Sequence, residues 1–567
     1  MSSAGVRFNT ERSKRRNLSA RLSDSVLFLQ HGVDNLIRRL RRGSRPAVTQ
    51  QRFVIVQIDG LSRTVLDKAL AAGRMPFLRQ LLRRKGHRLE PMSVGLPTST
   101  PAFQMAAMYG LRPPDIPGFH YYSRERGGDI HFPRRGHAAW VEGKLAAGRR
   151  GILDSGSAYG CVFTGGAENS FFTFATLTRP SGRGVLAALS PFLVLAWTCA
   201  ASSVRTLIEL IRMAPHLANP KTRQQSRRWF AIKVGISVWV RGFFTMATSR
   251  DLYAGVPAVY VNYVDYDEAA HAFGPQSRAA MVTLTRVDRA LRQLWRVVRR
   301  VPEHRYDFYV LADHGQTACK PYREINAGKS FERWIFDELL TNHPHASKPD
   351  TRSEQTLAHG IRSRKRGVTG FFQKYLNYVD EDYMRREDPE AYERDGVRVI
   401  SAGPNALFYV LDTNEPCDLD ALEARFPGLA ERLSQSPGVG LVLARSKQGP
   451  ICYSRGKRYC FSELAAGPFA KRADAALVVQ GIGDLMTMPS AGDFVIYGTS
   501  AAEGHVSFIP ENGSHAGPSA DEMNTFIVHP SKVTLPAPIT HPVQLYEHFI
   551  GYQRPAEHHA PAPAAAV

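Results

Sequence analysis

The fold is decided by the stretch Phe53-Val54-Ile55-Val56-Gln57-Ile58, which runs directly into Asp59-Gly60. This run is short and almost entirely apolar, as expected for a strand that is buried on both faces of a sheet. Four later runs of the same kind are separated by longer amphipathic segments, at residues 258–264, 307–312, 406–411 and 525–528. This alternation predicts an α/β fold with a mostly parallel central sheet that helices cover on both faces.

A chain of 567 residues with 43% hydrophobic residues is expected to fold into more than one structural unit. We expect a catalytic α/β domain over residues 51–180 and 250–550, interrupted by an apolar helical insert over 181–249. A basic amphipathic leader over 1–50 precedes this domain. A disordered tail over 551–567, rich in Ala and Pro, follows it. The six cysteines show no paired spacing and are expected to be free thiols.

The formal net charge of +22 favours contact with something anionic: nucleic acid, a membrane surface or a phosphorylated substrate. No recognised nucleic-acid-reading module accompanies the basic clusters. In the leader, apolar residues recur at helical spacing and arginines crowd the end, which predicts an amphipathic helix. That helix either docks on the body of the protein or lies at an interface with anionic lipid head groups.

The insert contains two apolar stretches whose relation to a membrane has to be considered. Residues 185–204 carry no charge and are about as long as a bilayer span, whereas residues 229–247 contain Lys233 and Arg241. A single crossing is excluded, because the site residues described below lie on both sides of the insert. A membrane hairpin, a surface-bound pair and two buried helices of a soluble cap remain, and Pro191 and the internal charges disfavour the hairpin. With no secretory signal, we expect a cytoplasmic protein or a peripheral or monotopic one.

Residues of the kind that bind metals stand at or beside the ends of several predicted strands, where functional groups gather in open α/β sheets. In chain order they are Asp59, Asp265, Asp267, His271, the pair Asp313-His314, and His515 within Gly513-Ser514-His515-Ala516-Gly517. One such pair is common in proteins, but Asp and His beside several separate strands are not explained by chance. Carboxylates mixed with imidazoles suit zinc or manganese better than calcium or magnesium.

A candidate nucleophile stands in the run 96–108, which reads as a turn that feeds a helix. We predict Thr100 at the N-cap and Pro101 at the first helical position, where proline is pre-organised. A hydroxyl at that place lies beside free backbone N–H groups and the positive end of the helix dipole, which is a favourable environment for phosphate. Threonine before proline is also an ordinary helix start, so this feature alone does not establish catalysis.

Taken together, these motifs resemble the metal-ligand series of the alkaline phosphatase superfamily, and most of all its type I phosphodiesterase/nucleotide pyrophosphatase branch. The resemblance spans roughly residues 51–330 and 495–550, in the order of the family's motifs, and rests on Asp59-Gly60, Thr100, Asp267 with His271, Asp313-His314-Gly315 and His515-Ala516-Gly517.

The resemblance implies two divalent metal ions, zinc or else manganese. One ion would be held by Asp267, His271 and His515. The other would be held by Asp59, Asp313 and His314 with Thr100 beside it, which leaves Asp265 as a second-shell or strand-end residue. Coordination to a dication would lower the pKa of the Thr100 hydroxyl, and a phosphothreonine intermediate would form there.

One part of the family pattern is missing. The branch holds a phosphate oxygen with an asparagine downstream of the nucleophile, and residues 115–122 contain none. His120 or Tyr121 is the candidate substitute for substrate binding. Sulfatases of the same superfamily need a modified Cys or Ser, which Thr100-Pro101-Ala102-Phe103 lacks.

The sequence therefore predicts a metal-dependent phosphoric ester hydrolase, a phosphodiesterase or phosphatase, acting on a phosphorylated small molecule or lipid. The alternative is a membrane-associated enzyme that hydrolyses or transfers phospholipid head groups, as the apolar insert and the basic leader suggest. A non-catalytic binding protein that kept the fold is a further alternative, disfavoured because every expected metal-site position is filled.

Overall fold

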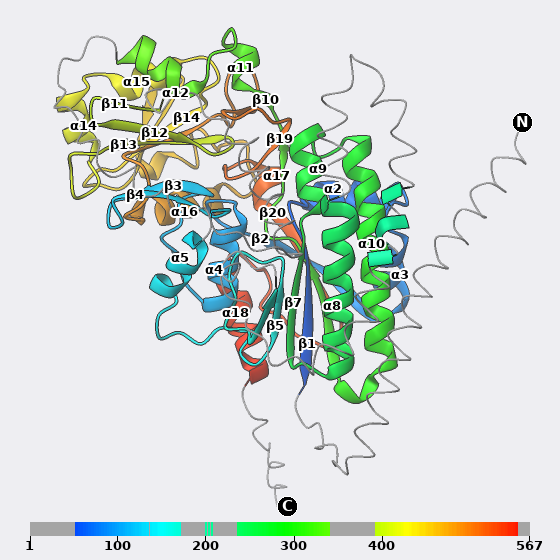
Figure 1. Cartoon of the computed structure of the whole chain (residues 1–567). Coiled ribbons are helices and arrows are strands. Elements are labelled where there is room, and N and C mark those ends of the chain that lie inside the picture. The colour runs from blue at the N-terminus through cyan, green and yellow to red at the C-terminus, as the bar shows by residue number, and fades with distance from the viewer. Residues whose placement is uncertain are drawn as a thin grey trace, which may run out of the picture.

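The computed structural model describes residues 51–134, 136–171, 199–200, 202–204, 206–207, 235–340 and 392–553. Its centre is a seven-stranded sheet in the order β2-β20-β8-β1-β7-β5-β6 (Figure 1). These strands are β1 Arg52–Ile58, β2 His87–Ser93, β5 Ser157–Tyr159, β6 Asn169–Phe171, β7 Ala258–Tyr263, β8 Tyr306–Leu311 and β20 Asn524–Pro530. The chain thus has the mixed α/β fold with a central sheet that the sequence predicts.

Strand β1 is the middle of this sheet and pairs in parallel with β7 on one side and β8 on the other. Strands β5 and β6 continue the parallel part beyond β7. By contrast, β20 runs antiparallel to both β8 and β2. The strand predicted at 525–528 therefore belongs to the central sheet but runs against its parallel neighbours.

Helices cover both faces of the central sheet because alternate side chains of β1 enter two different cores. Phe53 and Ile55 lie in one core, and Val54, Val56 and Ile58 lie in the other. The first core is closed by α4 Thr100–Tyr109, α5 His137–Leu145 and α18 Val543–Ile550. The second core is closed by α2 Arg63–Ala71, α3 Pro76–Arg84, α8 Arg241–Ala254, α9 Asp265–Phe273 and α10 Arg278–Arg300 (Figure 1).

A second, antiparallel sheet lies beside the first, in the order β11-β12-β13-β17-β14-β15-β16 (yellow and orange in Figure 1). Its strands are β11 Glu393–Arg394, β12 Val397–Ser401, β13 Asn405–Val410, β14 Leu441–Ala444, β15 Ile451–Ser454, β16 Lys457–Tyr459 and β17 Phe494–Tyr497. One face carries α11 Tyr322–Ile325, α12 Phe331–Trp334, α14 Leu419–Arg425 and α15 Leu429–Gln435, and the other packs with α16 Ala475–Thr487 against the body.

The strand expected at 406–411 belongs to this second sheet, so its assignment to the central parallel sheet is wrong. The wrong assignment has a physical cause: strand β13 is buried on both faces. Leu407 and Tyr409 pack toward the central body, while Ala406, Phe408 and Val410 pack toward the outer helices. A strand with two buried faces is apolar throughout, whether its neighbours are parallel or antiparallel.

Short elements complete the description. They are β3 His120–Ser123 with β4 Gly128–His131, β9 Thr317–Ala318 with β19 Gly513–Ser514, β10 Lys320–Pro321 with β18 Val506–Ser507, α17 Ala520–Met523, the π-helices Gly235–Val240 and Ile335–Leu339, and the 3-10 helices Pro302–His304, Phe461–Glu463 and Gly551–Gln553. All six cysteines are free, as predicted.

The predicted leader over 1–50 and most of the apolar stretch 185–204 lie outside the described residues, as does 554–567 of the predicted tail. Part of the second apolar stretch is described: α8 packs on β7 and β5, and its Phe244 and Leu252 are buried in the core of the catalytic body. Across the part of the chain that the structure describes, no helix combines the length and the apolar character that crossing a bilayer needs.

Candidate active site

The predicted ligands gather at the carboxyl-terminal edge of the parallel strands. Asp59 follows β1, and the pair Asp313-His314 follows β8. Helix α9 begins directly after β7 and carries Asp267 and His271 on its first turns. His515 comes from the loop after β19, which pairs with β9 and so brings a distant part of the chain beside β8. Parallel strands end at the same edge, so the topology itself brings these side chains together.

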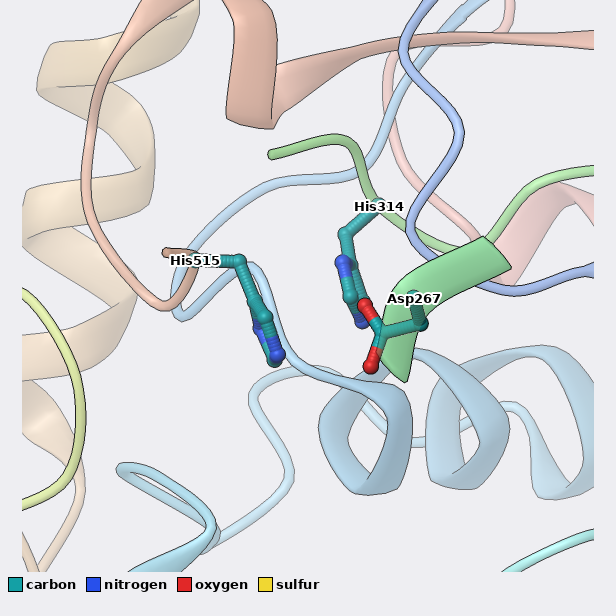
Figure 2. Close-up of side chains that lie close together, drawn as sticks. All are labelled: Asp267, His314 and His515. Carbon is teal, nitrogen blue, oxygen red and sulfur yellow. The ribbon is translucent and has the colours of Figure 1, made fainter. Parts of the chain in front are cut away.

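Two groups of side chains lie close enough to hold a metal ion. In the first, one ligand atom each of Asp267, His314 and His515 lie within 4.8 Å of one another. Figure 2 shows these three side chains pointing toward one another, and the rings of His314 and His515 are stacked with centroids 3.8 Å apart. In the second group, Asp59, Asp313 and His314 meet the same distance limit. His314 therefore stands between the two groups.

His271 lies on the outer side of the first group. Its Nε2 is 3.2 Å from Asp267 Oδ2, and its ring centroid is 5.0 Å from that of His515. The structure thus brings all six predicted Asp and His ligands together in one cluster. It differs from the predicted division in one respect, because His314 rather than His271 completes the tighter group with Asp267 and His515.

The three imidazoles are oriented in the same way. In each, Nδ1 faces a main-chain carbonyl oxygen: Gly513 O at 2.9 Å from His271, Gly315 O at 3.1 Å from His314 and Thr98 O at 2.9 Å from His515. A carbonyl oxygen only accepts, so Nδ1 carries a proton in each ring, and Nε2 is the nitrogen that faces the cluster and could bind a cation. Metal-binding histidines are typically held in this way.

The electrostatics of the cluster call for a cation. Burial raises the pKa of Asp59 well above its ordinary value, and the charges of Asp313 and Asp267 raise it further. Burial likewise raises the pKa of Asp313 to about 8. Burial lowers the pKa of His314, and its neutral Nε2 faces Asp313 Oδ2 and Asp59 Oδ1, each at 3.4 Å. Buried carboxyls of this kind lose their protons readily only when a positive charge lies beside them, and a cation between these oxygens and Nε2 would supply that charge.

Asp313 supports the same reading, because its buried Oδ2 has no hydrogen-bond partner among the described residues. A buried carboxylate oxygen without a donor is destabilising, whereas a metal ion would satisfy it. The donor set of carboxylates and imidazoles fits zinc or manganese. These acidic and histidine clusters could therefore hold a metal.

Thr100 is the first residue of α4, one position further into the helix than predicted. The N-cap is Ser99, whose extended backbone (φ −141°, ψ 144°) is the conformation that caps require. The Thr100 side chain is consequently not used for capping. Its Oγ1 lies 3.4 Å from Asp59 Oδ1 and 3.2 Å from His314 Nε2, at the second of the two groups.

Close backbone approach shapes the cluster at Gly60, which follows Asp59. Its φ is +72°, and a Cβ there would lie 2.3 Å from Asp267 Oδ1. Only glycine allows the carboxylate of α9 to lie against the end of β1.

Several residues that hold the ligands in place were not predicted. Asn262 Nδ2 donates to Asp59 Oδ2 at 2.6 Å, and Gln316 Nε2 donates to the Asp267 carbonyl oxygen at 3.1 Å. Thr98 Oγ1 accepts from Ala516 N at 3.0 Å and donates to Gly517 O at 3.0 Å, which ties the His515 loop to the segment before Thr100. Glu511 contacts His271. Each lies within a few residues of a motif, and that proximity is the only signal the sequence contains.

The predicted substrate-binding residues lie in the hairpin of β3 and β4. Tyr121 is buried in the core shared by the two sheets. His120 Nε2 is 3.4 Å from Asp129 Oδ2, and Asp129 also pairs with Arg398 of the second sheet at 2.6 Å. Asp265, expected as a strand-end residue, is the first residue of α9 and pairs with Arg241 of α8.

Comparison with known proteins gives one family. The profile of the family described as type I phosphodiesterase/nucleotide pyrophosphatase matches residues 53–389, which is more than half of the chain. No curated protein matches the sequence.

Solved structures that are similar to this chain at low identity include the following three. Murine ectonucleotide pyrophosphatase/phosphodiesterase 5 is 12% identical over 90% of this chain and 97% of its own, with a TM-score of 0.42. Its inactive variant in complex with AMP is 11% identical over 89% and 95%, with a TM-score of 0.41. Phosphonoacetate hydrolase from Sinorhizobium meliloti 1021 in complex with phosphonoformate is 14% identical over 90% and 98%, with a TM-score of 0.40.

Proposed function

The chain belongs to the type I phosphodiesterase/nucleotide pyrophosphatase family and is therefore a phosphoester hydrolase; from this premise we propose that it cleaves phosphoric esters with Thr100 as its nucleophile and two divalent metal ions. The observation that carries the proposal is the position of Thr100 Oγ1, within 3.4 Å of Asp59 and 3.2 Å of His314 in a buried cluster of carboxylates and imidazoles.

We assign one ion to Asp267, His271 and His515, and the other to Asp59, Asp313 and His314, with zinc favoured and manganese as the alternative. When bound, such ions lower the pKa of a nearby hydroxyl and neutralise charge on the phosphoryl oxygens. The position of His314 between the two groups supports a site in which both ions share one compact cluster.

The protein's own residues explain how the nucleophile is aimed. Helix α4 begins at Thr100, so the positive end of its dipole lies where an anionic phosphoryl group would meet the hydroxyl. Ser99 takes the N-cap position, which leaves the Thr100 hydroxyl for chemistry. Every residue of α4 is buried, and this packing holds Oγ1 in a fixed position.

The reaction then proceeds in two steps, formation and hydrolysis of a phosphothreonine. Thr100 Oγ loses its proton and bonds to phosphorus, while the bond from phosphorus to the leaving oxygen breaks and that oxygen takes up a proton. Water then attacks the phosphothreonine, the Oγ–P bond breaks, and the Thr100 hydroxyl is restored. The products are the alcohol and a phosphate, or a phosphomonoester when the substrate is a diester.

The proposal is tested with bis-p-nitrophenyl phosphate and p-nitrophenyl phosphate in the presence of zinc or manganese. Thr100→Ala should reduce kcat/KM by at least about 10³-fold, because the nucleophile is lost. Thr413→Ala is the matched control: its Oγ1 donates to Val410 O at 3.2 Å in the second sheet and touches no site residue. A wild-type protein without activity, or a Thr100→Ala variant with the full rate, would show that the mechanism is wrong. The ratio of diester to monoester rates gives the substrate class.

A further inference from the structure

The segment Glu511–Asn512–Gly513 surrounds His271 at the end of α9. The Glu511 Oε2 atom lies 2.7 Å from His271 Nδ1, and Gly513 O lies 2.9 Å from the same nitrogen. The intervening residue holds the main chain, because Asn512 N donates to His271 O at 2.8 Å and Asn512 Nδ2 donates to Ala272 O at 3.0 Å. Three consecutive residues thus contact both the side chain and the backbone of one ligand.

From this arrangement we propose that Glu511 is a positioning residue that makes His271 a metal ligand and strengthens the site formed by Asp267, His271 and His515. The inference rests on the proposed function, and it deepens it by distinguishing the two metal sites from each other.

The carboxylate of Glu511 is itself held on its other side. It is 3% exposed, and its Oε1 accepts from Ser507 Oγ at 2.8 Å and from Ser514 Oγ. One carboxylate oxygen of Glu511 is thus held by the two serines, and the other faces His271.

Glycine at position 513 is required for this approach. A Cβ on Gly513 would lie 2.4 Å from Ala270 O of α9, a distance at which the backbones could not stay together. The absence of a side chain allows the Gly513 carbonyl and the Glu511 carboxylate to reach the same ring nitrogen. His271 is thus held by the backbone of residue 513 as well as by the side chain of Glu511.

The comparison with the other two imidazoles shows why Glu511 matters. Nδ1 of His314 and Nδ1 of His515 each face a main-chain carbonyl oxygen, whereas Nδ1 of His271 faces a carboxylate as well. A carboxylate behind an imidazole fixes its orientation and raises the basicity of the opposite nitrogen, and loss of such a partner typically weakens metal binding 10–100-fold. The site of Asp267, His271 and His515 therefore has a carboxylate behind one of its imidazoles.

Ser514 links this charge to the neighbouring ligand, because it donates to Glu511 and directly precedes His515. The five residues from Glu511 to His515 therefore supply one proposed ligand and the support for another. Packing of residues 511–515 against α9 therefore assembles the site of Asp267, His271 and His515.

The experiment measures metal binding to the purified full chain. Wild type, Glu511→Ala and Glu511→Gln are stripped of metal and titrated with Zn²⁺ alone by calorimetry, and bound zinc is counted by mass spectrometry after dialysis. We expect two sites in the wild type. In Glu511→Ala one site should weaken about 10–100-fold, so that about one ion is retained at limiting zinc. Glu511→Gln should be intermediate, because the amide keeps an acceptor oxygen but lacks the charge.

Two further measurements separate positioning from a general structural role. Glu423→Gln is the matched control, because Glu423 lies beside the second sheet and accepts from Gly428 N at 2.7 Å. This variant should leave both zinc sites unchanged. Hydrolysis by Glu511→Ala should recover at saturating zinc, since Glu511 acts through His271, whereas Thr100→Ala should not recover. The near-isosteric Glu511→Gln carries the test if Glu511→Ala does not fold.

The outcomes are distinguishable. If the wild type binds two ions and both Glu511 variants bind them with unchanged affinity, this inference is overturned while the proposed function stands. If the wild type binds no metal, both are overturned. If Thr100→Ala keeps the full rate while Glu511→Ala loses one ion, the metal site is real and the nucleophile assignment is wrong.

Discussion

Replacement of Gly60 by alanine tests how closely the proposed metal site depends on the approach of α9 to β1. The added Cβ would lie 2.3 Å from Asp267 Oδ1 and 3.1 Å from Asp267 Cγ. A carbon and an oxygen need roughly 3.3 Å, so the carboxylate must move by about 1 Å. A displacement of that size in a catalytic site costs about 10²-fold in rate, equivalent to about 2.7 kcal/mol of transition-state stabilisation.

The substitution also strains the backbone, because Gly60 has a φ of +72°. Alanine in this left-handed region costs about 1–2 kcal/mol of folding stability, whatever space is available. Gly73 provides the control that separates the two effects. Its φ is +67°, but a Cβ there would meet no atom within 4 Å.

The assay compares Gly60→Ala and Gly73→Ala in three measurements: urea unfolding, zinc affinity and kcat/KM with bis-p-nitrophenyl phosphate. Both variants should lose about 1–2 kcal/mol of unfolding free energy relative to wild type. Only Gly60→Ala should also bind zinc more weakly and lose about 10²-fold in kcat/KM. If the two variants have equal zinc affinity and equal activity, Asp267 does not depend on the space left by Gly60, and the reasoning is refuted.

Three further predictions concern buried polar side chains. Asp493→Ala should lower the unfolding free energy by at least about 3–5 kcal/mol, because the buried carboxylate accepts from Arg124 Nη2 at 2.8 Å and from two main-chain N–H groups; a loss below 1 kcal/mol in urea unfolding would contradict this. Burial raises the pKa of Asp288 to about 6, so the folded state retains its proton above pH 4. Wild-type stability should therefore fall by about 3 kcal/mol relative to Asp288→Asn as pH rises from 4 to 6 and then stay level, which unfolding curves at successive pH values check. Thr98→Val removes the hydrogen bonds to the His515 loop and keeps the side-chain shape; zinc affinity should fall while secondary structure by circular dichroism is unchanged, and unaltered zinc binding would show that the loop is held by other contacts.

Much of the site follows from short sequence motifs because the chain topology has few alternatives. Asp59 follows β1 and Asp313 follows β8, and the two strands are paired in parallel, so their ends must meet at one edge. The spacing of Asp267 and His271 places both on one face of a helix for the same kind of local reason.

The second sheet was not predicted, because strand 406–411 is apolar throughout and gives no sign of which sheet it joins. Its alternate residues are buried against two different cores, and the pairing is decided by contacts with β12 and β17, which lie at different separations in the chain. Sequence periodicity reports burial and not the identity of the neighbouring strand.

The sequence by itself determined which residues could do the chemistry of this protein. Thr100 at the start of a helix, with Asp and His beside the ends of successive strands, is a local pattern that backbone geometry converts into one cluster. The tertiary structure alone decided how the cluster is shared and supported. It placed His314 between the two groups, moved the helix cap to Ser99, and brought Glu511 behind His271. The contacts of His314 and of Glu511 join parts of the chain that are about two hundred residues or more apart, and only packing of the folded chain selects them.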